Sequence, residues 1–134
     1  MTPRNWTIAG LVALLVVFLV SFLPQYVKAS RLSGELRAAR QEYSKGQLRD
    51  LASVMYFQAT QKNYGLATAT SSRFFNRARE VAGETSDSAS RKAIEDLAGF
   101  RDKVTAGLAK GDPAVLNDLQ ALFVKTRQAT GTTD

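Results

Sequence analysis

The sequence predicts an all-α protein with an N-terminal transmembrane helix, a short coiled-coil-like stalk and two antiparallel helical hairpins that form a small bundle. Three observations lead to this fold class. An uncharged apolar run opens the chain, apolar residues beyond it recur at helical spacing, and no segment alternates with period two for long enough to form a strand. The expected organisation is an anchor at 1–24, a stalk at 25–46, a helical-hairpin domain at 47–128 and a flexible tail at 129–134.

The apolar run covers residues 6–23, and no charge lies between Arg4 and Lys28. Its 18 residues would rise about 27 Å as a helix, close to the roughly 30 Å of a bilayer's hydrocarbon core. Twelve of them are Leu, Ile, Val or Phe, which together favour insertion by about 5 kcal/mol. Trp6 and Tyr26 bracket the run, as aromatic side chains at the two membrane interfaces do.

A cleaved signal peptide is the alternative to an anchor. Arg4 supplies a short positive region, and Pro24 is expected to break the helix. Val27 and Ala29 put small or medium residues at positions −3 and −1 of a candidate cleavage site before Ser30. The apolar run is longer than the roughly 7–15 residues usual in signal peptides, which favours the uncleaved anchor.

Two features of the N-terminal region point to opposite topologies. The cluster of Lys and Arg at 28–40 outnumbers Arg4 and favours a cytoplasmic domain. A single signal-like segment with almost no hydrophobic sequence after it favours translocation of the whole domain. We expect the domain to lie on the external side of the membrane, which is the periplasm if the source is bacterial.

The composition excludes several kinds of chemistry. The chain has 134 residues, with 18 Lys and Arg against 12 Asp and Glu, no Cys and no His. Disulfides, zinc sites built from Cys and His, Cys nucleophiles and His general bases are therefore excluded. The basic surplus is small and mixed with acids, so nucleic-acid binding is not expected. We find no catalytic constellation, and we expect no enzymatic activity, no cofactor and no metal site.

The stalk carries apolar residues at the spacing of a coiled-coil seam. Leu32, Leu36 and Tyr43, with Ala29 and Ala39, recur at alternating steps of three and four residues. Such a seam would pair with a second copy or with another membrane protein; the alternative is a helix packed on its own domain. Lys45-Gly46 is a natural place for this helix to stop or bend.

Beyond the stalk, periodicity predicts helices at 47–62, 66–82, 89–110 and 113–128. Turn signals separate them at 63–65, 83–90 and 111–113. Phe57 lies off the apolar face of the first of these helices, so it either packs on a second neighbour such as the stalk or contacts a partner. Tyr64, in the first turn, is a further candidate for partner contact.

Two turns, at 62–67 and 110–113, resemble those of tetratricopeptide-type helical hairpins. Phe74 and Ala78 stand roughly where the second helix of that repeat carries its aromatic and small residues. Asn63 and Asp112 are 49 residues apart, against a repeat period of about 34. Because the spacing does not fit the repeat period, the resemblance implies helical hairpins that serve as an interaction module rather than true repeats.

The favoured function is a membrane-anchored, non-enzymatic interaction or accessory protein, such as a subunit of a membrane complex. Its partner would be another protein, or a second copy through the stalk. The alternative is an exported helical bundle that binds a small molecule or lipid near four aromatic residues, Phe57, Phe74, Phe100 and Phe123.

Overall fold

The computed structural model describes residues 3–131, without the side chains of residues 3–6, 22 and 23. Across this range the elements are helices joined by short turns, with no strand, which confirms the all-α class. The chain divides into two compact units, residues 1–39 and 40–134. The first unit holds the N-terminal part of α1 (Pro3–Thr60), and the second holds the rest of the chain.

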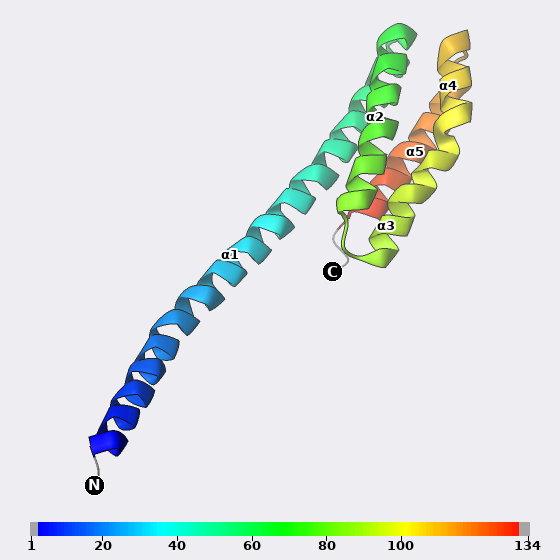
Figure 1. The fold of residues 1–134 in the computed structure, drawn as a ribbon. Helices are drawn as coiled ribbons and strands as arrows, with labels where there is room; N and C mark the ends of the chain where they lie inside the picture. The colour runs from blue at the N-terminus through cyan, green and yellow to red at the C-terminus, as the bar shows by residue number, and fades with distance from the viewer. Residues whose placement is uncertain (1–2, 132–134) are drawn as a thin grey trace. The chain divides into compact units, whose positions relative to one another are not determined.

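The second unit is a helical bundle (Figure 1). Its elements after α1 are α2 (Tyr64–Glu84), α3 (Ser88–Glu95), the 3₁₀ helix η1 (Asp96–Phe100), α4 (Arg101–Lys110) and α5 (Val115–Thr130). α2 packs on α3, η1 and α4, and these three elements pack on α5. With the C-terminal part of α1 against α2, the unit contains the two expected pairs of antiparallel helices.

Helix α1 is longer than predicted, because neither expected break ends it. It continues through Pro24, where the missing N–H removes one backbone hydrogen bond of the helix. It also continues through Gly46, where we expected a stop or bend. A glycine inside a helix costs about 0.5–1 kcal/mol, and the neighbouring Ser44 and Leu48, both buried, offset that cost through packing.

Arg77 of α2 joins that helix to α1 through several polar contacts. Its Nε donates to Gln47 Oε1 at 2.9 Å, and its Nη2 donates to Ser44 Oγ at 2.8 Å. Ser44 Oγ in turn donates to Glu84 Oε2 at 2.9 Å. Further along, Thr70 Oγ1 donates to Gln58 Oε1 at 2.8 Å. Residue numbers on α2 fall as those of their partners on α1 rise, so the two helices run antiparallel.

The hydrophobic core is built from the predicted apolar stripes. Within the second unit, two stripes at helical spacing are buried or half-buried. They are Leu48, Leu51, Ala52, Met55, Tyr56 and Ala59 on α1, and Ala67, Ser71, Phe74, Phe75, Ala78, Val81 and Ala82 on α2. The rings of Phe74 and Phe75 meet edge to face with centroids 5.1 Å apart. The fully buried core side chains with the largest volumes are Phe74, Leu48, Met55, Ile94, Leu97, Leu108, Leu119 and Leu122.

The turns that close both hairpins share one backbone geometry. After α1, Asn63 N–H bonds to Gln58 O and Lys62 N–H to Ala59 O, each at 2.9 Å. After α4, Gly111 and Asp112 repeat the same pair of bonds, each at 3.1 Å. Both turns are Schellman motifs, with Lys62 (φ 60°) and Gly111 (φ 62°) in the left-handed region. Lys62 therefore occupies a position that glycine usually takes.

The helix expected at 89–110 is interrupted. The 3₁₀ helix η1 separates α3 from α4, with Gly99 near its end. Leu97 is buried and Phe100 is half-buried, which matches the three-residue period of a 3₁₀ helix. On α3, Ile94 is buried, whereas the neighbouring Ala93 is only half-buried.

Helix α5 is displaced at both ends from its predicted range. It begins at Val115, because Asp112 and Pro113 form a turn in which Ala114 N–H donates to Asp112 Oδ1 at 2.9 Å. It ends at Thr130, and Ala129 and Thr130 are buried. Arg49 of α1 donates to Thr130 O at 2.7 Å and so holds this end of the helix. Of the expected tail, residues 132–134 lie outside the described residues.

Replacing Arg77 with alanine tests how much the contact between α1 and α2 contributes to stability. Arg77→Ala removes the hydrogen bonds to Ser44 and Gln47, and we expect it to lower the free energy of unfolding by about 1–3 kcal/mol. Urea unfolding of the detergent-solubilised full chain, followed by circular dichroism, measures the change. Arg73→Ala, an exposed arginine one turn earlier on α2, is the control and should leave stability within about 0.5 kcal/mol. Equal effects of both variants would contradict the role assigned to Arg77.

Gly107 marks the closest approach of α4 to α5. A Cβ atom at this position would lie 2.7 Å from Val115 Cγ2 and 2.8 Å from Val115 Cβ. We expect Gly107→Ala to lower the free energy of unfolding by about 1–3 kcal/mol, since the neighbouring helix would have to shift. Gly65→Ala is the matched control, because nothing lies within 4 Å of its Cβ and alanine favours the helix there. The same urea experiment would refute the close packing if Gly107→Ala were neutral.

Candidate functional site

The N-terminal part of α1 exposes its apolar side chains. Every described large hydrophobic residue from Ile8 to Val20 is about half-exposed or more. Among the described helices, α1 is the one long and apolar enough to cross a membrane, a property that signal sequences near an N-terminus share. Of the two predicted interface residues, Tyr26 is exposed, and the side chain of Trp6 lies outside the described part.

The predicted seam of the stalk is exposed along its whole length. Leu32, Leu36 and Tyr43 are 68%, 64% and 68% exposed, and Ala29 and Ala39 are exposed as well. Large apolar side chains at regular helical spacing are normally buried against a neighbour. The seam therefore presents an apolar strip that no residue of the described chain covers.

The two residues predicted to contact a partner lie in different environments. Phe57 is 60% exposed on α1, and Val54, one turn earlier, is 45% exposed. Tyr64, at the start of α2, is half-buried and packs against the core. A Cβ at Gly111 would lie 3.4 Å from the Tyr64 ring, so this tyrosine touches the second hairpin's turn. Phe57 offers apolar surface, whereas Tyr64 contributes to packing.

A groove of about 350 Å³ lies between α2 and the segment formed by α3, η1 and the start of α4. Phe75, Ala78 and Ala82 of α2 and Ile94 of α3 supply buried apolar side chains at its base. Ala78, Ala82, Gly83 and Ala98 leave this space unfilled, because alanine has a small side chain and glycine has none. The residues that line it are Phe75, Ala78, Arg79, Ala82, Gly83, Ile94, Glu95, Ala98 and Arg101.

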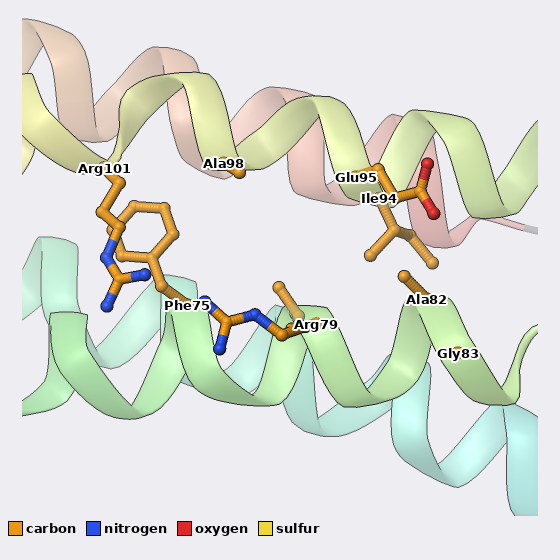
Figure 2. A pocket seen from close by; sticks show the side chains of 9 residues that line it. Phe75, Arg79, Ala82, Gly83, Ile94, Glu95, Ala98 and Arg101 are labelled. Atoms are coloured by element: carbon orange, nitrogen blue, oxygen red, sulfur yellow. The ribbon is translucent and has the colours of Figure 1, made fainter.

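Charged side chains lie at both ends of this groove. Figure 2 shows the guanidinium groups of Arg79 and Arg101 near Phe75 at one end, and the carboxylate of Glu95 at the other. In the described part of the chain, neither arginine forms an ion pair. Two guanidinium groups that form no ion pair and lie beside apolar surface are suited to bind an anion with an apolar tail.

Asp87 caps the helix that forms one wall of the groove. Its Oδ2 accepts a hydrogen bond of 2.7 Å from Ser90 N–H. The pKa of Asp87 lies below its ordinary value of 3.8, chiefly because the Ser90 side chain and then the Ser90 backbone hydrogen-bond to its carboxylate. The cap's contribution to stability is therefore fully present above the unfolded pKa and is lost as the pH falls through the lower folded pKa.

The groove is not where the sequence placed a ligand. Phe74 is fully buried in the core, and Phe57 is exposed on α1. Phe100 and Phe123 are half-buried against the core. The aromatic residue that lines the groove is Phe75, and the sequence signal for the groove is the spacing of small residues at 78, 82 and 98. In the described residues, no group of three or more His, Cys, Asp or Glu side chains is arranged to hold a metal ion.

These features define an all-α protein with a long apolar N-terminal helix and a packed helical bundle. The chain matches no protein-family model, no curated protein and no solved structure.

Proposed function

We propose that this protein is a membrane-anchored, non-enzymatic interaction or accessory protein. Its N-terminal helix would hold the helical bundle at a membrane surface, where the bundle meets a protein partner as part of a membrane complex. The observation that carries the proposal is the uninterrupted exposure of large apolar side chains from Ile8 to Val20 on α1. Water disfavours such a surface, whereas a bilayer stabilises it by about 5 kcal/mol.

The helical hairpins support an interaction role for the bundle. They resemble tetratricopeptide-type hairpins in their turns, and we propose that they serve as an interaction module in the same general way. Phe57 and Val54 present apolar surface on α1 that a partner would cover. We place the bundle on the external side of the membrane, periplasmic in a bacterium, because a single N-terminal signal-like helix directs translocation of the domain behind it.

Charged substitutions inside the apolar run test the anchor. Leu14→Arg with Val17→Arg should cost about 5–7 kcal/mol of insertion, enough to cancel the favourable term and release the protein from carbonate-washed membranes. Ser30→Arg with Ala38→Arg adds the same charge at exposed positions outside the run and should leave the protein in the membrane. Intact mass and protease digestion of spheroplasts accompany the fractionation.

The outcomes of this experiment are distinct. A full-length mass with digestion only from outside supports an anchored external domain. A mass that begins at Ser30 would overturn the anchor, since the apolar run would then be a cleaved signal. A full-length protein whose bundle resists external protease would place the bundle in the cytoplasm.

The groove between α2 and α3 favours a second candidate function, an exported bundle that binds a small amphiphilic molecule or lipid. Its volume lies within the range of small-molecule sites, and Arg79 and Arg101 suit an anionic head group. Octanoate, used below its micellar concentration, is the probe.

Octanoate should raise the midpoint of thermal unfolding of the wild-type chain, measured by circular dichroism. At a concentration ten times the dissociation constant, we expect a stabilisation of about 1.4 kcal/mol. Arg79→Ala with Arg101→Ala should abolish this response, whereas Arg73→Ala, outside the groove, should keep it. A response that persists in the double variant, or that octanol produces equally, would exclude an anion-selective groove.

A further inference from the structure

The exposed seam of α1 has a heptad register. Ala29, Leu36 and Tyr43 take the a positions, and Leu32 and Ala39 take the d positions. These five positions are all exposed, although their spacing is that of a packed interface. The register also assigns the flanking charges, with Glu35 at a g position and Arg40 at the following e position.

The charges at these flanking positions are complementary to those of a second copy of the seam. In a parallel, in-register pair of helices, a g residue of one chain faces the following e residue of the other. Glu35 of each chain then faces Arg40 of its partner, so a symmetric dimer contains this ion pair twice. An antiparallel pair would instead bring g against g and e against e, which sets like charges opposite each other.

Both charged groups are available for such a pairing. Among the residues that the structure describes, neither Glu35 nor Arg40 forms an ion pair within the chain. By contrast, Glu42, at the next g position, is paired with Lys45 of its own helix at 3.3 Å. The one g–e combination with opposite charges in the seam is thus also the one left without an internal partner in the described chain.

We infer that the seam is a homodimer interface, occupied by the same seam of a second copy in parallel and in register, with Glu35–Arg40 ion pairs on both flanks. The parallel orientation rests on the proposed anchor, because two copies inserted in one membrane point the same way. The seam is short, about 21 Å between Ala29 and Tyr43, so confinement to a membrane raises the effective concentration that stabilises it.

Single cysteines test the interface in the full-length protein, in native membranes. The chain has no native cysteine, so each variant reports one position. Leu36→Cys and Leu32→Cys should cross-link to themselves under mild oxidation, because a and d residues meet their own copies in a parallel dimer. Ala38→Cys, on the opposite face of the same helix, is the control. We expect roughly tenfold more dimer for Leu36→Cys than for Ala38→Cys on non-reducing gels. Equal cross-linking at both positions would show random collision and overturn the inference.

Charge exchange tests the partner's identity. In the Leu36→Cys background, Glu35→Arg alone and Arg40→Glu alone should each reduce self-cross-linking roughly tenfold, because each sets like charges opposite each other. Co-expression of the two variants should restore it, since their heterodimer regains both opposite-charge pairs. A loss that co-expression does not rescue would indicate a different protein on the seam, and would overturn self-association.

Failure of the proposed membrane anchor and failure of the proposed dimer interface give different results. A chain that leaves the membrane on carbonate washing yet keeps position-specific cross-linking would be an unanchored dimer. A chain that stays in the membrane but cross-links equally at positions 36 and 38 would be anchored without this interface.

Discussion

The polar contact between α1 and α2 sets the register in which these two helices pack. Arg77 is partly buried, and a guanidinium group in that position needs acceptors from its neighbours. Gln47 and Ser44 of α1 supply two of them, and Glu80 and Glu84 of α2 supply ionic partners. These bonds are directional, so they set the register in which the apolar side chains of the two helices meet. Leu48 and Phe74 are then both fully buried.

Local patterns in the sequence predicted some features of the fold, whereas contacts between distant residues determined the others. Apolar periodicity predicted the buried faces of α2, α5 and the C-terminal part of α1, because an apolar stripe on a helix of the bundle faces the core. It did not identify the continuity of α1 through Gly46, since a local stop signal worth about 1 kcal/mol is overridden by packing between distant residues. The end of α5 at Thr130 depends likewise on Arg49, a residue 81 positions earlier.

The two candidate surfaces, the seam and the groove, differ in whether the sequence alone could predict them. The exposed seam was predicted, because a heptad pattern is local and its residues occupy one helix. The groove was not, because it depends on which small residues of α2 and η1 face each other once the chain has folded. Sequence reasoning looked for a ligand near aromatic residues, and the bundle uses most of those rings for packing. The 3₁₀ turn at η1 helps to bring Ala98 to the groove and gave no signal in the apolar pattern.

Within the second unit, α1 has an exposed face and a face that packs on α2. Tyr43 ends the seam and is exposed, whereas the next residue, Ser44, is buried and donates to Glu84 of α2. At 100° per residue, Tyr43 and Leu48 point about 140° apart on the helix. Covering Tyr43 with another chain therefore does not compete with the packing of Leu48 in the core. The folded bundle leaves Tyr43 exposed, and this exposure costs solvation free energy that a second apolar helix would recover.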